Sequence, residues 1–517
     1  MPEKRGDTMS YGRADKQQLQ KYIDKTEALI DEIVNSKTSV TVTGTSYYVS
    51  AQGDDSNDGL SPETPWATVA KVSNYTDFKP GDGIFFKRGD TFRFETFEMH
   101  SNLTYSAYGE GKKPLLLASL DGVGKGKWVA TEYPNIYAFT EKLCGDSTDY
   151  TKNRDVGHIC INGGKCWGIK VQETKEGNRL NIGTVFNGIE HYTTTVGQFR
   201  GEMDLDHNLE YFHNWDSETL FMYCDMGNPG EVFESMEIAL RGRGIVVGEW
   251  IQTEHHGPRR SAENVVVDNL EVHGTGSHAL VGCFFKNTLV QYSVFKWIGG
   301  AIQGKYIFDR NYSTRFGDAV ECCFADNHVV RYCYASQVYD CCFTVQWGAP
   351  STMVNIEMYN NVSEFCNTGL EIWNNGGVMK NMDLHDNITR FNGYGWSNQR
   401  PGKDGNFFYG AYWVVKESEN NHIRNNLNYC SSKFSHLLRA TGSKYYNFHD
   451  NIYVMEEGKM LGGIVENPAT SEGERINAEY TRENIEKYQA MGFESGTEFY
   501  EIEKEPLGDM FKVCVTK

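Results

Sequence analysis

The sequence lacks long hydrophobic runs, and no stretch approaches the roughly 20 apolar residues that a membrane-spanning helix needs. Residues 1–38 also lack the short apolar core of a secretory leader. Proline is scarce, at 12 of 517 residues, whereas glycine occurs 53 times. We therefore expect a cytoplasmic protein, rich in strands and turns, that has no membrane partner.

Positive charge is also in short supply. Lys and Arg number 50 against 69 Asp and Glu, which gives a net charge of −19. Such a surface repels nucleic acid and anionic membranes, so neither is expected as a partner. The same charge disfavours polyanionic substrates such as pectin or alginate, unless a local basic groove overrides it.

The 13 cysteines lack the paired C-x₂-C spacing of a structural zinc site. Two adjacent pairs, Cys322-Cys323 and Cys341-Cys342, fall inside strand-like runs, where neighbouring side chains point to opposite faces. We expect these cysteines to be reduced and buried, and we expect neither a metal nor another cofactor.

Residues 13–36 show the three- and four-residue apolar spacing of one amphipathic helix. The apolar positions are Leu19, Tyr22, Ile23, Leu29, Ile30 and Ile33. This helix, within an N-terminal extension at 1–44, has two interpretations. It associates two chains into a homo-oligomer, or it packs back onto the body of its own chain.

Residues 264–454 contain an internal repeat of 20-odd residues, stretched to about 40 in two places. Such a period with short β-rich runs is typical of a β-solenoid. The repeats begin at Asn264, Asn287, Asn327, Asn355, Asn381 and Asn421. One repeat position holds Asn269, Asn361, Asn387, Asn426 and Asn451, whose side chains are expected to hydrogen-bond from rung to rung.

The predicted fold is all-β, a right-handed parallel β-helix. The predicted organisation is an N-terminal cap and first coils at 45–117, irregular β-rich coils or an insertion at 118–260, core repeats at 261–455, and a C-terminal cap at 456–517. A helix is expected near Thr481 to Met491. Gly274 to Ala279 matches a dinucleotide-binding glycine pattern, but strand-like residues follow it, so nucleotide binding is not expected.

The second strands of successive repeats can be aligned. Ile302, Val320, Phe343 and Leu370 share the phase that points into the core, while Gln303, Glu321, Thr344 and Glu371 share the outward phase. Asp318 and Asp340 precede their strands at the turn. Because rungs stand about 4.8 Å apart, the alignment predicts three converging carboxylates, on Glu321, Asp340 and Glu371.

Carboxylates beside exposed aromatic rings are typical of glycoside chemistry, in which one acid protonates the leaving oxygen and a second carboxylate attacks or activates water. The predicted substrate-binding residues are Trp373, Gln346, Trp347, Trp396, Arg400, Gln303 and Asp318, with the tryptophans as sugar platforms. The competing interpretation is an ordinary solvated face, with a 391–401 loop that is packed by its own aromatics.

Two sets of segments resemble known proteins. Residues 47–92 resemble the opening cap of bacterial right-handed β-helix carbohydrate-active proteins. The runs FGDAVECCF, QVYDCCFTVQW, NTGLEIWN and GYGWSNQRPGKDG resemble β-helix glycoside hydrolases of the β-xylosidase and fucosidase/xylanase types. The resemblance implies an Asp and a Glu on neighbouring coils, which are Asp340 and Glu371 here, with Glu321 as the rival. Gly317-Asp318-Ala319 departs from the Gly-Asn-Gly of those families.

We therefore expect a glycoside hydrolase that cleaves short neutral oligosaccharides, retaining and exo-acting. Asp340 with Glu371, one rung apart, would approach the about 5–5.5 Å of retaining enzymes, whereas Glu321 with Glu371 would approach the wider spacing of inverting ones. One alternative is a polysaccharide lyase or uronate epimerase, which would need a Lys, Arg or His base. A second alternative is a non-catalytic glycan-binding protein.

Overall fold

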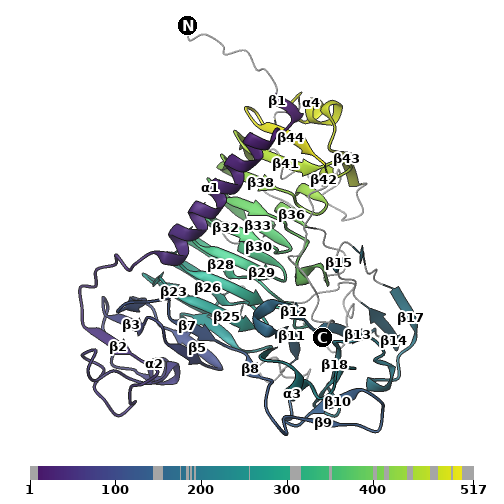
Figure 1. The fold of residues 1–517 in the computed structure, drawn as a ribbon. Helices are drawn as coiled ribbons and strands as arrows, with labels where there is room; N and C mark the ends of the chain where they lie inside the picture. The colour runs from purple at the N-terminus through teal and green to yellow at the C-terminus, as the bar shows by residue number, and fades with distance from the viewer. Residues whose placement is uncertain are drawn as a thin grey trace.

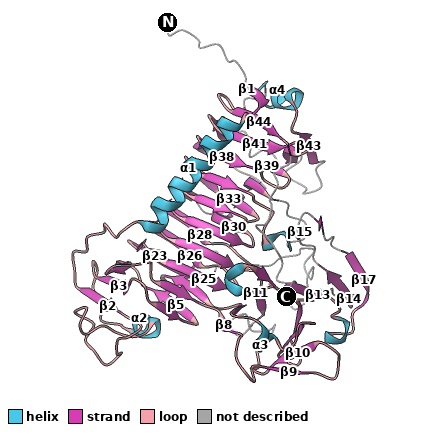
Figure 2. Cartoon of the chain, viewed as in Figure 1, coloured by secondary structure: helices cyan, strands magenta, loops and turns pink. Residues whose placement is uncertain are grey.

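The computed structural model is almost entirely β-structure (Figures 1 and 2). Among the described residues, no helix has the length and apolar character needed to cross a membrane. The structure describes residues 10–143, 155–174, 176–181, 185–186, 189–190, 194–254, 257–302, 316–348, 352–399, 405–412, 418–438, 446–465, 475–490 and 493–503.

The body is a right-handed parallel β-helix, which confirms the predicted fold class. Its first face is a sheet of 11 parallel strands stacked rung on rung. In stacking order they are β1 (Ser10–Arg13), β44 (Glu498–Ile502), β41 (Ile452–Glu456), β38 (Leu427–Tyr429), β35 (Ile388–Arg390), β32 (Val362–Glu364), β29 (Tyr334–Val338), β27 (Val294–Ile298), β25 (Glu271–Thr275), β7 (Leu115–Leu117) and β4 (Thr91–Arg93).

A second, 20-stranded sheet forms the other two faces. The long strands β26 (Leu280–Gln291) and β28 (Val320–Arg331) run through both, because their two halves pair with different neighbours. The second face continues with β30 (Cys341–Gly348), β33 (Thr368–Asn375), β36 (Asn406–Tyr412), β39 (Phe434–Leu438) and β42 (Met460–Val465), and the third face with β31 (Thr352–Tyr359), β34 (Val378–His385), β37 (Glu419–Arg424) and β40 (Asn447–His449).

Shorter strands complete this sheet at its N-terminal end. They are β2 (Ser46–Val49), β3 (Gly83–Lys87), β5 (Thr96–Met99), β6 (Thr104–Tyr108), β21 (Gly244–Val247), β22 (Glu249–Thr253), β23 (Gly257–Glu263) and β24 (Val266–Asp268). At the other end, β43 (Arg475–Glu479) pairs antiparallel with β42, and the helix α4 (Arg482–Ala490) follows, where the sequence predicts a helix.

The interior column confirms most of the predicted alignment. Val320, Phe343 and Leu370 are in register on adjacent strands, and all three are buried. The position assigned to Ile302 is wrong, because Leu280 is the residue that pairs with Val320. The first half of β26, and not the segment that follows β27, is the rung before Val320. Ile302 is buried outside the column, against residues of the insertion.

The predicted asparagine ladder is present at the turn between the third and first faces. Asn361, Asn387, Asn426 and Asn451 are buried, and each Nδ2 donates to the next Oδ1 at 3.0–3.1 Å. Asn269, at the equivalent position, instead accepts hydrogen bonds from two basic side chains of the N-terminal cap. This ladder satisfies buried polar groups along the length of the solenoid.

A second ladder, which the sequence analysis did not predict, runs along the exposed edge of the third face. Its residues have φ between 52° and 59°, a left-handed conformation that asparagine tolerates better than other non-glycine residues. Their amides hydrogen-bond from rung to rung at 2.8–3.1 Å, and Asn264 Nδ2 donates to Asn102 Oδ1 at 2.7 Å. The members are Asn264, Asn287 and Asn327, and then Asn355, Asn381 and Asn420.

The N-terminal helix α1 (Lys16–Asn35) lies lengthwise along the solenoid (Figure 1). Asp15 caps it by accepting the backbone N–H of Gln18 at 2.8 Å. Its apolar side packs on the outward aliphatic residues of the first face, with Tyr22 and Ile33 buried. The helix thus packs back onto its own chain, which is one of the two interpretations that the sequence left open.

Strands from residue 120 to residue 240 form mainly antiparallel sheets beside the solenoid, in which only β13 and β18 pair parallel among the described strands. Their bounds are β8 (Leu120–Asp121), β9 (Trp128–Ala130), β10 (Ile136–Phe139), β11 (Val156–Ile161), β12 (Cys166–Trp167), β13 (Ile169–Glu173), β14 (Asn178–Asn181), β15 (Val185–Phe186), β16 (Ile189–Glu190), β17 (Thr194–Gln198), β18 (Glu210–Asn214), β19 (Thr219–Tyr223) and β20 (Met236–Leu240). The short helices α2 (Val69–Asn74) and α3 (Pro229–Val232) lie in the cap and in this insertion.

A buried ion pair anchors the insertion to the solenoid. Asp155 Oδ2 lies 2.6 Å from Lys170 Nζ and accepts the backbone N–H of Ile302 at 2.8 Å. Burial alone would raise the pKa of Asp155, but Lys170 and the ring of His213 hold that pKa well below its usual range. The carboxylate therefore stays charged where the two parts of the chain meet.

The adjacent cysteine pairs follow the sequence expectation. Ten described cysteines are free and mostly buried, including both adjacent pairs. Cys166, which lies outside these pairs, is disulfide-bonded.

Candidate active site

Glu321, Thr344 and Glu371 stand in one column on the second face, because β28, β30 and β33 are in register at these positions. Both glutamates are buried, with 8% and 2% of their surfaces exposed. Val281 occupies the next place in the column, where the alignment puts Gln303. Gln303 itself lies outside the described residues.

Glu371 is held by neighbours on the preceding strand. Its Oε1 accepts hydrogen bonds from Thr344 Oγ1 at 3.3 Å and from Gln346 Nε2 at 3.2 Å. Gln346, predicted to bind substrate, thus positions this carboxylate. Trp373 is in register with Gln346 on the next rung and is partly exposed. Gln346 and Trp373 thus place a polar and an aromatic side chain beside the buried carboxylate of Glu371.

Asp318 and Glu321 share a histidine that the sequence analysis did not identify. His278 Nδ1 lies 2.9 Å from Asp318 Oδ2 and 2.8 Å from Glu321 Oε2. His278 and Asp318 each stand two residues before the registered pair Leu280 and Val320, so they occupy equivalent turns on adjacent rungs. Treating Leu280 as a rung of the core would have placed this histidine beside Asp318.

The electrostatics of this cluster favour a proton on Asp318. Burial and the neighbouring charge of Asp340 raise the pKa of Asp318 to about 7. Burial alone would lower the pKa of His278, but the carboxylates of Glu321 and Asp318 hold it well above its usual range. Asp318 Oδ1 also accepts the backbone N–H of Cys341 at 2.9 Å, which fixes the orientation of the carboxyl group.

Asp318 and Asp340 lie close together at the start of their strands. One oxygen of Asp318, one oxygen of Asp340 and the thiol sulfur of Cys341 all lie within 4.8 Å of one another. Asp340 is partly exposed, whereas Asp318 is buried. A protonated carboxyl beside an accessible second carboxyl is the arrangement that glycoside hydrolysis requires. The separation between Asp340 and Glu371 stays a prediction.

The same cluster also offers ligands for a cation. The ligand atoms of His278, Asp318 and Glu321 lie within 4.8 Å of one another. One imidazole nitrogen and two carboxylates are donors that a divalent metal accepts, and such an ion would displace the proton from this side of His278.

The sugar-platform prediction for Trp396 is wrong, because its side chain is fully buried. Its indole Nε1 donates to the carbonyl of Gln337 at 2.8 Å, and its ring lies 4.7 Å from the ring of His158 in the insertion. The short 3₁₀ turn Trp396–Gln399 thus forms part of the interface between solenoid and insertion. Contacts between residues about 240 positions apart decide this burial, and local sequence does not reveal them.

Two other predicted residues cannot be placed around the cluster. Trp347 belongs to strand β30, but its side chain lies outside the described residues, as does the whole of Arg400.

No family model matches the chain. Lacto-N-biosidase of Bifidobacterium longum subsp. longum is 29% identical over 147 residues, which span 26% of this chain and 9% of that protein. The chain therefore aligns with a small part of this relative.

Solved structures with similar backbones are remote in sequence. One, described as XylC in complex with xylose, is 14% identical over 81% of this chain and 68% of that chain, with a TM-score of 0.45. The GH136 lacto-N-biosidase of Eubacterium ramulus is 12% identical over 89% of this chain and 68% of that chain, with a TM-score of 0.37. A rhamnogalacturonan lyase is 12% identical over 84% and 80% of the two chains, with a TM-score of 0.43.

Proposed function

We propose that this protein is a glycoside hydrolase that acts on short neutral oligosaccharides, with Asp318 as the general acid and Asp340 as the second carboxylate. The observation that carries the proposal is the pKa of Asp318, raised to about 7 beside the accessible carboxylate of Asp340. An acid with a pKa near the working pH is protonated often enough to donate and still donates readily.

In this mechanism the Asp318 carboxyl donates its proton to the glycosidic oxygen as the bond to the anomeric carbon breaks. The Asp340 carboxylate attacks that carbon or takes a proton from the attacking water. If Asp340 attacks the carbon, water then cleaves the glycosyl–Asp340 ester while Asp318 takes a proton from that water. If Asp340 acts as the base, it releases the proton of the water to solvent and Asp318 regains one from solvent. Because their oxygens fall within 4.8 Å, the pair fits the closer spacing of retaining enzymes. Trp373 offers a partly exposed ring for stacking on a sugar.

Glu371 remains the alternative acid, as the sequence resemblance implies. Its two hydrogen-bond donors, Thr344 and Gln346, suit an ionised carboxylate that orients substrate at least as well. Substituting Asp318 and Glu371 separately distinguishes these roles.

Two observations support the substrate class. The net charge of −19 disfavours a polyuronate, and the matched segment of lacto-N-biosidase supports glycosidase chemistry over the aligned quarter of the chain. His278 supplies the kind of base that a lyase needs, but it faces two carboxylates, which favour its charged form.

The test incubates the protein with a panel of neutral aryl glycosides and, separately, with uronate polymers. Released phenol supports the proposal, whereas the ultraviolet absorbance of an unsaturated product would assign a lyase. Proton NMR of the first product on the best glycoside gives the stereochemistry. Retention supports the close carboxylate pair, and inversion would shift the assignment to Glu321 and Glu371.

A further inference from the structure

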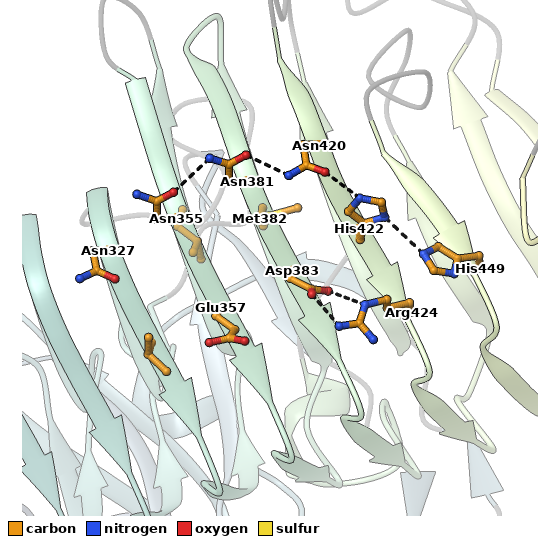
Figure 3. A pocket seen from close by; sticks show the side chains of 12 residues that line it. Asn327, Asn355, Glu357, Asn381, Met382, Asp383, Asn420, His422, Arg424 and His449 are labelled. Atoms are coloured by element: carbon orange, nitrogen blue, oxygen red, sulfur yellow. Dashed lines mark hydrogen bonds and ion pairs between the residues drawn. The ribbon is translucent and has the colours of Figure 1, made fainter.

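The third face carries a groove of about 540 Å³ that is separate from the carboxylate cluster. Its floor is formed by strands β31, β34, β37 and β40, and one edge is the exposed asparagine ladder (Figure 3). Two histidines, His422 on β37 and His449 on β40, stand at the C-terminal end of this groove with their rings facing each other. The hydrogen bonds around them determine which ring nitrogens carry protons.

The ladder fixes the tautomer of His422. Asn420 Nδ2 donates to Asn381 Oδ1 at 2.9 Å, so the carbonyl oxygen of Asn420 is the atom that faces His422. That oxygen lies 3.0 Å from His422 Nε2. Because a carbonyl oxygen only accepts hydrogen bonds, Nε2 of His422 is the protonated nitrogen. In the neutral ring, Nδ1 then holds a lone pair.

A carboxylate fixes the tautomer of His449 in the same way. His449 Nδ1 lies 2.7 Å from Asp450 Oδ2, so Nδ1 is the protonated nitrogen and Nε2 holds the lone pair. His422 Nδ1 and His449 Nε2 are 3.3 Å apart. Two unprotonated nitrogens therefore face each other at close range. Their lone pairs repel unless an electron-pair acceptor binds to both.

We propose that His422 Nδ1 and His449 Nε2 bind a divalent transition metal, with Zn²⁺ as the best-fitting ion, which bridges strands β37 and β40. Two imidazole nitrogens at about 2.0–2.1 Å from a tetrahedral ion stand about 3.3 Å apart, which matches the observed separation. Imidazole donors suit Zn²⁺, Cu²⁺ and Ni²⁺ but not Ca²⁺ or Mg²⁺, which take oxygen ligands.

The surroundings complete the coordination. The exposed Asn447 side chain places its amide Nδ2 3.5 Å from His422 Nδ1, and turning the amide over puts its carbonyl oxygen in that place as a third ligand. The groove leaves room for a water as the fourth. Asp450 and the Asn420 carbonyl orient the two rings from behind, which is the usual support for a metal-bound histidine.

The experiment titrates the full chain, freed of metal by a chelator, with ZnCl₂ in a calorimeter. The wild type should bind one more Zn²⁺ than the His422→Ala/His449→Ala variant does. Asp450→Asn should weaken that binding about tenfold, because it removes the carboxylate behind the ring. The matched control is His385→Ala: His385 Nδ1 also contacts a following aspartate, at 2.7 Å, but among the described residues its other nitrogen lies near a glutamate and not near a second imidazole.

Cobalt gives an independent readout. Co²⁺ in a site with two imidazoles should produce visible absorption bands in the wild type and in His385→Ala, and the double variant should lose the contribution of one bound Co²⁺ to these bands. Identical Zn²⁺ titrations of wild type and double variant would overturn the proposal, because the histidine pair would then share only a proton. Hydrolysis of the best aryl glycoside should be unchanged in the double variant, so the outcome is independent of the proposed function.

Discussion

The second and third faces of the solenoid are built from the same kind of strand and both present acidic columns, but water reaches them differently. On the second face Glu371 is 2% exposed, and its hydrogen bonds come from side chains of its own sheet. On the third face the Asp383 side chain is 33% exposed and pairs with Arg424 through two contacts at 2.7 and 3.0 Å. The insertion packs beside the start of the second-face strands, where Gly300 and Ile302 contact it.

Burial therefore separates carboxylates suited to chemistry from carboxylates that form surface ion pairs. An exposed acid keeps an ordinary charge state, and its pairs contribute little to stability. A buried acid near a second acid is pushed toward its protonated form, as Asp318 is by Asp340. Four predictions test this contrast between buried and exposed groups.

The largest expected effect is on catalysis. Asp318→Asn should lower kcat/KM on the best aryl glycoside by about 10²–10⁴-fold, because it removes the proposed general acid. Asp383→Asn, a matched change on the third face, should leave kcat/KM unchanged. Steady-state kinetics of the two variants measure both values, and near-normal turnover by Asp318→Asn would contradict the assignment.

The next effect is on stability. Asp155→Asn should lower the free energy of unfolding by about 3–5 kcal/mol, because it removes the carboxylate that pairs with the buried ammonium of Lys170. Asp383→Asn should lower the free energy of unfolding by no more than about 1 kcal/mol, because the ion pair between Asp383 and Arg424 is partly solvated. Urea unfolding followed by circular dichroism gives both numbers. Equal losses in the free energy of unfolding would show that the buried ion pair contributes no more to stability than the partly solvated one.

The two asparagine ladders allow a finer comparison. Asn387→Ala should lower the free energy of unfolding by about 2–3 kcal/mol, because it removes one hydrogen bond from a buried side chain on each neighbouring rung. Asn381→Gly in the exposed ladder should lower the free energy of unfolding by about 1 kcal/mol or less, since water replaces the lost hydrogen bonds and glycine adopts a positive φ without strain. Thermal unfolding of the two variants should rank them in this order, and the reverse ranking would contradict it.

The smallest effect is a shift in pH dependence. The proposed acid must be protonated, so activity should fall as pH rises through about 7, the pKa of Asp318. The charge and hydrogen bond of His278 lower that pKa. His278→Gln should therefore move the alkaline limb to higher pH while the acid remains. A profile of kcat/KM against pH tests the sign, and movement to lower pH would exclude Asp318 as the titrating group.

Periodicity made the solenoid predictable. The spacing of Asn361, Asn387 and Asn426 and the phase of Val320, Phe343 and Leu370 follow from a repeat that each rung must satisfy, so sequence alone placed them. The same strand register correctly predicted that Glu321 and Glu371 stand in one column.

The rest of the site depends on contacts outside the repeat. His278 was missed because the alignment took Ile302, which follows β27, as the rung before Val320, whereas Leu280 on β26 occupies that rung. Trp396 was misjudged because its neighbours, such as His158, lie in the insertion. The closeness of Asp318 to Asp340 and its raised pKa depend on how the turns fold, which periodicity does not specify.

The pairing of β1 with β44 has a consequence for how the molecule assembles. Each rung of a solenoid normally needs only the rung before it, so the coils can form in order as the chain emerges. Here the first described strand completes the last, and Tyr11 contacts Glu501, 490 residues further on. Strand β1 can therefore dock only after β44, about 490 residues later in the sequence, has formed. Its docking marks the end of assembly, and a probe on Tyr11 would report completion of the fold in a single event.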